Sequence, residues 1–246
     1  MNHTSKLLLF LCLILCSSCV QYRDLLSYDA APGVPTAPQP ITNQTAILIQ
    51  PNDVISVNVS SSSVAAAAPF NSAAGGYQVD ADGMIELPTL GLFRVKDLSV
   101  STIKANLKAA LRPYFSEEPM VNIRLVNFKI NVNGEVGNPG IFQIENGSVT
   151  IVDALTLAGD FTPYSRRDSI MIVREFKGER TFGYVDFNSA DVFNSPYYFL
   201  QQNDMIYVRP RKEKVGTVND ESGVWLRFVS IATGLVAITL SLIRTL

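Results

Sequence analysis

The two ends of the chain are its most apolar parts, and they limit what the protein can be. Residues 7–16 read LLLFLCLILC. At about 1.5 Å per helical residue, this run is too short to cross a hydrocarbon layer of roughly 30 Å. Residues 224–243 form a longer run with one charged residue, Arg227, and as a helix it is long enough to cross. The sequence therefore predicts an N-terminal export signal and a C-terminal transmembrane helix.

The residues after the first apolar run point to lipid attachment. Ser17, Ser18 and Cys19 follow it directly, which is the layout of a signal peptide. Small residues before a cysteine resemble a bacterial lipobox, in which the thiol is acylated after cleavage. Cys16 stands where Leu is usual, and bulky Leu15 makes Cys16 the poorer acceptor. Cys19 is the predicted lipidation site, and the alternative is an ordinary signal peptide cleaved nearby.

Cleavage before Cys19 would exclude several kinds of chemistry. His3, Cys12 and Cys16 all lie in the removed segment, so the mature chain would hold one cysteine and no histidine. An intramolecular disulfide, a Ser-His-Asp or Cys-His nucleophile and a His/Cys zinc site are then impossible. The formal net charge of −2 argues against a nucleic-acid partner, because phosphate binding needs clustered Lys and Arg. We expect no metal and no cofactor.

Between the apolar ends, the sequence predicts a tether followed by two folded regions. Four prolines in residues 20–44 favour an extended spacer, and the alternative is an arm that wraps a neighbouring subunit. The predicted divisions are a signal peptide at 1–18, a tether at 19–44, folded regions at 45–127 and 128–210, a polar linker at 211–222 and the membrane helix at 223–246.

The first folded region is expected to combine short strands with one helix. Asp82-Gly83 marks a hairpin turn, and Ser99 has the character of a helix N-cap. Asp80 and Asp82 lack the further ligands of a calcium loop. The expected order is a strand at 54–59, a loop of small residues at 60–74, strands at 77–79, 84–87 and 92–95, a helix after Ser99 and a strand at 120–128.

The second folded region has the element order strand-strand-helix-strand-strand, which predicts a β-grasp unit and an α+β fold class. Thr150 and Asp153 resemble a capping box at the start of its helix, and Gly159 is suited to the end. The expected strands are 129–136, 141–144, 169–175 and 180–187, and the expected helix is 151–158.

A short internal repeat, which we call the sequence echo, lies at the start of the first folded region and at the end of the second. Residues 50–57 and 201–208 both read Q-x-N-D-apolar-I-x-V. Asn-Asp favours a turn, and the apolar alternation after it favours a strand. We therefore interpret the two Asp residues as turn formers and not as catalytic groups.

The predicted membrane helix is not uniform around its axis. Ser230, Gly234, Ala237 and Ser241 fall on one stripe, and small residues of this kind permit close packing of helices in a membrane. In a ring of such helices, this face would line a pore or contact a neighbour. The alternative is a single-pass anchor.

Several motifs resemble a known family. Residues 77–95, YQVDADGMIELPTLGLFRV, resemble the start of the polysaccharide biosynthesis/export domain. VNGEVGNPGIFQI at 132–144 and DALTLAGDFTPYSRRDSIMIVR at 153–174 resemble the SLBB domain, with Asp160 in place of the second Gly of A-G-G. Residues 201–208 resemble the closing strand of the family. The chain thus resembles the outer-membrane polysaccharide export (OPX, Wza-like) lipoproteins.

The resemblance implies a function as well as a fold. Such lipoproteins form rings with a periplasmic body, and their C-terminal helices form a barrel in the cell outer membrane through which capsular polysaccharide or exopolysaccharide passes uncut. Their partners are the inner-membrane polymerase and co-polymerase. In larger relatives, a strand before the export domain can pack with the SLBB unit, and residues 50–57 would fit that place.

Two other functions are alternatives to a channel. The first is a membrane-anchored glycan-binding or scaffolding lipoprotein without a pore, which the oligomeric state would distinguish from a channel. The second is an enzyme that acts on polysaccharide. Glycosidases need two carboxylates that face each other across a bond, whereas Glu117 with Glu118 and Asp220 with Glu221 are sequence neighbours typical of solvated loops. We expect no enzymatic activity.

Overall fold

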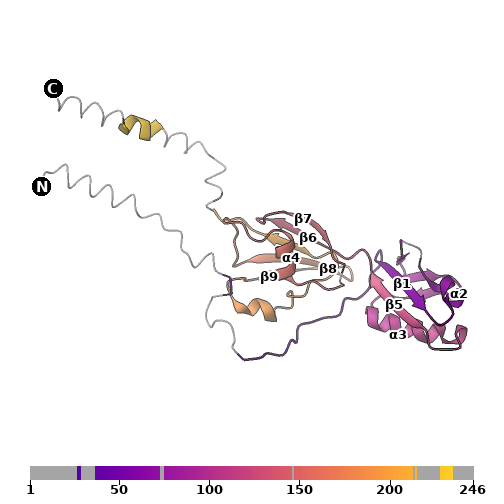
Figure 1. The fold of residues 1–246 in the computed structure, drawn as a ribbon. Helices are drawn as coiled ribbons and strands as arrows, with labels where there is room; N and C mark the ends of the chain where they lie inside the picture. Colours follow the sequence, from indigo (N-terminus) through magenta and orange to yellow (C-terminus); the bar gives the residue numbers. More distant parts are fainter. Residues whose placement is uncertain are drawn as a thin grey trace, which may run out of the picture.

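The computed structural model describes residues 27–28, 37–72, 75–145, 147–212, 214 and 228–234. Its strands and helices form two packed units that follow each other along the chain (Figure 1). We call the part from β1 to β5 the N-terminal unit and the part from β6 to β10 the C-terminal unit.

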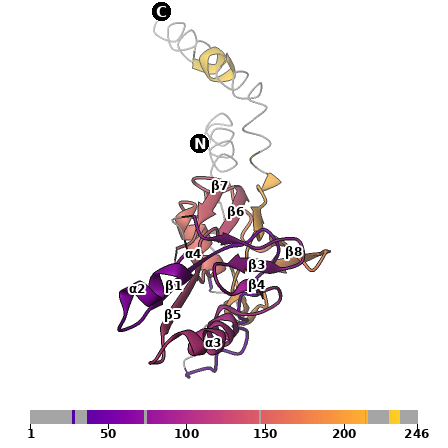
Figure 2. The same cartoon turned by 90° about the vertical axis from the view of Figure 1, so that its right-hand side faces the viewer.

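The N-terminal unit is a three-stranded antiparallel sheet, a separate hairpin and one long helix. The sheet has the order β2-β1-β5, and β3 pairs with β4. Figure 2 views this unit from its end, with α3 below the strands. The elements are β1 (Val54–Ser60), β2 (Tyr77–Gln78), β3 (Met84–Leu87), β4 (Gly91–Arg94), α3 (Val100–Leu111), the 3-10 helix η3 (Arg112–Tyr114) and β5 (Met120–Leu125).

The core of this unit forms where α3 covers one face of the sheet. Ile103, Leu107 and Leu111 recur every fourth residue and are buried, so they form one stripe of the helix. Val57 pairs with Ile123 in the register of β1 with β5, and both are buried in the same core. The Ser99 hydroxyl caps α3 by accepting a hydrogen bond from the Thr102 N–H at 3.1 Å, as predicted.

The prediction of an irregular loop over residues 60–74 is wrong in part. This segment contains α2 (Val64–Ala67) and the 3-10 helix η2 (Ala68–Phe70). The run of alanines has high helix propensity, and the Ser63 hydroxyl accepts a hydrogen bond from the Ala66 N–H at 3.4 Å. Phe70 is buried and packs against the rings of Tyr114 and Phe115, so this turn closes one end of the unit.

The C-terminal unit is a five-stranded mixed sheet with the order β7-β6-β10-β8-β9. β10 lies parallel to β6, and the other neighbouring pairs are antiparallel. The predicted order strand-strand-helix-strand-strand is present, and the last strand inserts at the centre. The elements are β6 (Lys129–Gly134), β7 (Gly140–Gln143), α4 (Ile151–Leu157), β8 (Ile170–Phe176), β9 (Glu179–Val185), η4 (Ala190–Asn194) and β10 (Met205–Val208).

The start and end of α4 follow the sequence signals. Thr150 and Asp153 form the predicted capping box. Gly159 (φ 74°) and Asp160 (φ 60°) both take the left-handed conformation after the helix. The Asp160 carboxylate accepts a hydrogen bond from the Phe161 N–H at 2.7 Å. Asp tolerates this conformation better than most residues, so replacement of the usual Gly keeps the turn.

The segment before β1 packs on the C-terminal unit of its own chain. In Figure 1 it runs from beside η4 to the N-terminal unit. The Asn43 side-chain amide donates hydrogen bonds to the carbonyls of Phe193 and Ser195, each at 2.8 Å. Residues 37–44 belong to the predicted tether, so at least its last part is fixed to the folded body.

The predicted membrane helix is described in part. Residues 228–234 are helical. Within the described ranges, no helix is both long and apolar enough to cross a membrane. The rest of residues 223–246, the signal peptide and most of the 211–222 linker lie outside those ranges.

Candidate functional site at the junction of the two units

The two copies of the sequence echo fold into the same buried turn. The Gln50 N–H donates to Asp53 Oδ2, and the Gln201 N–H donates to Asp204 Oδ2, each at 2.8 Å. The preceding residues, Asn52 (φ 72°) and Asn203 (φ 65°), are both left-handed. Asp53 is 2% exposed and Asp204 is 0% exposed. The interpretation of both carboxylates as turn formers agrees with these contacts.

Asp204 has a cationic partner. Arg174 on β8 donates from Nη2 to Asp204 Oδ2 at 2.7 Å and from Nε to Oδ1 at 3.0 Å, which is a bidentate ion pair. The same Nη2 donates to the Phe199 carbonyl at 3.1 Å, and the guanidinium lies over the Tyr197 ring, 5.1 Å from its centroid. Burial raises the pKa of Asp204, and Arg174 acts against this rise.

Asp53 has no ion-pair partner among the described residues. Its nearest side-chain donor is Gln202 Nε2, at 3.4 Å from Oδ1. Burial raises the pKa of Asp53, and the hydrogen bonds from Gln50 and Gln202 offset this only in part. The two copies of the turn thus differ in charge compensation, although their backbone geometry is the same.

Gln202 and Asn127 tie the two turns together. Gln202 Nε2 donates to the Asn127 carbonyl at 2.9 Å, and Gln202 Oε1 accepts from the Lys129 N–H at 2.8 Å. Asn127 Oδ1 accepts from the Val54 N–H at 2.8 Å, and its Nδ2 donates to the Asn52 carbonyl at 3.1 Å. Only residues 126–128 connect β5 to β6, so the second turn of the echo holds the first across a short junction.

The expectation that strand 50–57 packs with the second unit is wrong. β1 pairs with β2 and β5 in the sheet of its own unit. The described contacts between the two copies run through side chains of their turns. The reason is that β6 and β8 already occupy both edges of β10, so no free edge remains there for β1.

Two other acidic residues singled out in the sequence, Glu118 and Asp80, have structural contacts. Glu118 forms an ion pair with Lys108 at 2.9 Å on the surface, whereas Asp220 and Glu221 lie outside the described residues. Asp80 Oδ1 accepts from the Met84 N–H at 2.8 Å in the turn before β3. Within the described ranges, no cluster of three or more His, Cys, Asp or Glu is placed to hold a metal.

The predicted stripe of small residues on the membrane-spanning helix is only partly described. Ser230 and Gly234 lie in the helical stretch 228–234, one turn apart. Ala237, Ser241 and the predicted lipidation site Cys19 lie outside the described residues. The stripe and the lipidation of Cys19 therefore stay predictions.

A buried carboxylate at the far end of the C-terminal unit was missed from the sequence. Glu135 is 7% exposed and receives hydrogen bonds from Lys214 Nζ at 2.6 Å and Thr162 Oγ1 at 2.7 Å. Burial acts to raise the pKa of Glu135, but these two partners outweigh it and the pKa is lowered. Glu135 belongs to the V-x-G-E-V motif, and this motif was the sequence signal that could have identified it. It fastens the segment that leads to the C-terminus.

Comparison with protein families agrees with the boundaries of the N-terminal unit. The sequence model of the family described as "Polysaccharide biosynthesis/export protein" matches residues 42–126. The match begins at the segment fixed by Asn43 and ends one residue before Asn127, so it takes in β1 to β5 with α3. The chain therefore carries the domain of the polysaccharide biosynthesis/export protein family.

Proposed function

We propose that the protein is a subunit of a ring that passively conducts capsular polysaccharide or exopolysaccharide across the outer membrane. The observation that carries this proposal is the export domain at residues 42–126, fastened to a second unit by the Gln202–Asn127 contacts. A ring closes only if every subunit has the same shape. A three-residue connection with a buried Phe128 favours one fixed arrangement of the two units.

The strand order of the C-terminal unit supports its assignment as an SLBB-type β-grasp unit. Its first and last strands, β6 and β10, lie parallel at the centre, and α4 covers one face. The opposite face carries exposed apolar side chains, including Ile141 (66%), Phe182 (59%) and Tyr184 (56%). Exposed apolar surface of this kind is typical of contact sites, and we assign it to contacts within the ring.

The first and the last described segments of the folded body, at Ser27 and Arg211, both contact one loop, residues 161–168. Arg167 donates to the Ser27 hydroxyl at 3.3 Å, and the Arg211 N–H donates to the Tyr164 carbonyl at 2.8 Å. The N-terminal segment leads back to the predicted lipid on Cys19, and the C-terminal segment leads to the predicted transmembrane helix. This arrangement supports a body held against one membrane at a single end.

The test is electron microscopy of full-length protein extracted in mild detergent. Class averages should show rings with an axial opening, which would also give the subunit number. Monomers with an intact C-terminal segment would contradict the channel and favour the alternative, a membrane-anchored glycan-binding or scaffolding lipoprotein without a pore.

Two variants test the membrane attachments separately. Cys19→Ala should leave the chain mislocalised, and normal delivery of this variant to the outer membrane would contradict lipidation. Deletion of residues 224–246 should abolish export while a folded body remains. Full export by the deletion variant would rule out a channel role for that segment.

A further inference from the structure

A cationic groove lies at the end of the C-terminal unit where both chain segments leave. It is an open cavity of about 410 Å³, and its lining includes the four cations Arg166, Arg167, Arg211 and Lys212 against one carboxylate, Asp168. The chain as a whole has a net charge of −2. The positive charge here is therefore a local concentration, and it fits an anionic ligand.

The guanidinium groups of the groove are held in place by the fold. Arg167 stacks over the Phe161 ring at 5.0 Å from the centroid, and Arg211 Nε donates to the Ser165 carbonyl at 3.0 Å. Arg166 makes two hydrogen bonds with Asp168, at 2.9 and 3.1 Å. Cations that are already ordered lose less conformational entropy when a ligand binds. Arg also has a fork of donors that matches phosphate geometry.

One polar atom beside these cations has an unmet hydrogen-bonding capacity. Asn188 lines the same groove, and its side-chain oxygen is buried with no hydrogen-bond partner in the described structure. A buried acceptor of this kind is rare, and a donor from outside the chain reaches it when the Asn188 side chain turns toward the groove. The fitting ligand thus combines a negative charge with a hydroxyl group.

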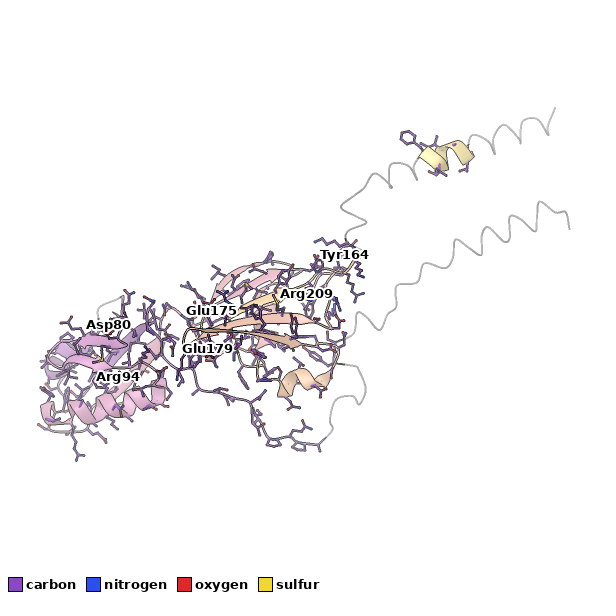
Figure 3. The ribbon with its side chains drawn as sticks, turned by 180° about the vertical axis from the view of Figure 1, so that it is seen from behind. Asp80, Arg94, Tyr164, Glu175, Glu179 and Arg209 are labelled. Carbon is purple, nitrogen blue, oxygen red and sulfur yellow. The ribbon has the colours of Figure 1, made fainter. Side chains whose placement is uncertain are left out.

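The position of the groove identifies the source of such a ligand. Tyr164 and Arg209 are close in sequence to the groove residues. Figure 3 shows both at the end of the C-terminal unit where the described body ends. Ser27 contacts Arg167 and lies eight residues after Cys19, a distance of at most about 30 Å for an extended chain. Clusters of Lys and Arg next to a membrane segment typically bind anionic lipid headgroups.

We propose that this groove binds the phosphate headgroup of an anionic membrane lipid, with phosphatidylglycerol as the best match. The phosphate would lie among the Arg and Lys side chains, and a glycerol hydroxyl would donate to Asn188. The groove would orient the body on the membrane, independently of the lipid on Cys19. This inference rests on the attachment to a membrane in the proposed function.

The test is native mass spectrometry of the full chain in detergent, with phosphatidylglycerol or phosphatidylcholine added. Both lipids carry a phosphate, but phosphatidylcholine has no net charge and no headgroup hydroxyl. The variant is Arg166→Gln/Lys212→Gln, and the control is Lys104→Gln/Arg124→Gln, which removes two exposed cations from the N-terminal unit. Wild type should retain phosphatidylglycerol selectively. The variant should weaken its retention roughly tenfold or more, and the control should not.

Two competition experiments identify the ligand. Inorganic phosphate at millimolar concentration should not displace phosphatidylglycerol, and displacement would mean a free-anion site. Binding of an oligogalacturonate in preference to phosphatidylglycerol would overturn the proposal in favour of contact with an acidic polymer. Equal lipid retention by the variant and the control would also overturn it.

Two readouts keep the result interpretable. Circular dichroism shows whether the double variant folds, and if it does not, Lys212→Gln alone replaces it and should still lose retention several-fold. Ring formation is scored on the same samples. Lipid binding by wild-type monomers would contradict the channel but not the groove, whereas intact rings without selective lipid retention would contradict the groove alone.

Discussion

The two copies of the Q-x-N-D turn show how one sequence motif can serve two different physical roles. Their backbones match in the left-handed Asn and in the Asp carboxylate that accepts from the Gln N–H. Their side-chain partners do not match, since Asp204 has Arg174 and Asp53 has Gln202. The motif specifies the turn, whereas residues far away in the sequence decide its electrostatic energy.

The comparison also shows which unit depends on the other. The Asp204 turn is completed by Arg174 within the C-terminal unit. The Asp53 turn lies in the export domain but is completed by Gln202, a residue of the C-terminal unit. We therefore expect the C-terminal unit to depend less on contacts with the other unit for its stability. The following predictions test this difference.

The largest effect is expected for loss of the buried ion pair. Asp204→Ala leaves Arg174 without its carboxylate, and the Arg174 side chain is only 18% exposed. Removal of one partner of a buried pair typically lowers the free energy of unfolding by about 3–5 kcal/mol. Urea denaturation of the full chain in detergent, followed by circular dichroism, measures it. A loss below about 1 kcal/mol would mean that Arg174 finds another partner.

A smaller effect is expected at the matched position of the other copy. Asp53→Ala removes the acceptor for the Gln50 N–H but leaves no cation unpaired, so the loss should be about 1–2 kcal/mol. Asp53→Asn keeps an acceptor oxygen and removes the buried charge, so it should not lower the free energy of unfolding. The same denaturation experiment ranks both against Asp204→Ala, and equal losses at the two Asp positions would contradict the distinction drawn here.

Local elements were predictable because their signals are local. The Ser99 cap, the Thr150–Asp153 capping box and the Asn-Asp turns each depend on residues within four positions of one another. The pairing of Arg174 with Asp204 and of Gln202 with Asn127 depends on the order of strands in space, which no short window of sequence contains. The same limit explains the wrong placement of β1.

The cationic groove illustrates this limit for a site. Arg166, Arg167 and Lys212 look like scattered surface charges in the sequence, and the net charge of −2 was used only to argue against a nucleic-acid partner. They come together because the chain after β10 runs beside the loop before β8, with the Arg166 N–H donating to the Arg209 carbonyl at 2.9 Å. Composition gives only the net charge of a chain, whereas binding depends on where the charges lie on its surface.

Gln202→Ala should loosen the junction itself. The substitution removes the donor to the Asn127 carbonyl and the acceptor for the Lys129 N–H, which should lower the free energy of unfolding by about 1 kcal/mol. Limited proteolysis should cut faster near residues 126–128. Gln201→Ala is the matched control, because Gln201 enters the network through its backbone N–H. Equal cleavage of the two variants would show that Gln202 does not hold the junction.

The uncompensated charge of Asp53 should produce a pH-dependent difference of smaller size. Burial raises the folded-state pKa of Asp53 above its unfolded value, so the folded protein binds the proton more tightly. Stability is then lost as pH rises through the unfolded pKa of about 4, up to the folded value. Relative to wild type, Asp53→Asn should be most favourable at pH 7 and should lose that advantage as pH falls toward 4. An advantage that grows on acidification would contradict the assigned sign.

The smallest effect is expected for the exposed ion pair between the units. Lys177 Nζ lies 3.5 Å from Asp97 Oδ1, and the two side chains are 52% and 32% exposed. Water screens such a pair, and ordering of the long Lys side chain opposes its attraction. The Gln50 side chain also donates to Asp97 at 3.2 Å, so the carboxylate keeps a partner without Lys177. Lys177→Gln should therefore leave the denaturation midpoint and the cleavage rate at residues 126–128 unchanged. A change as large as that of Gln202→Ala would mean that charge, and not the half-buried side-chain amide of Gln202, holds the two units together.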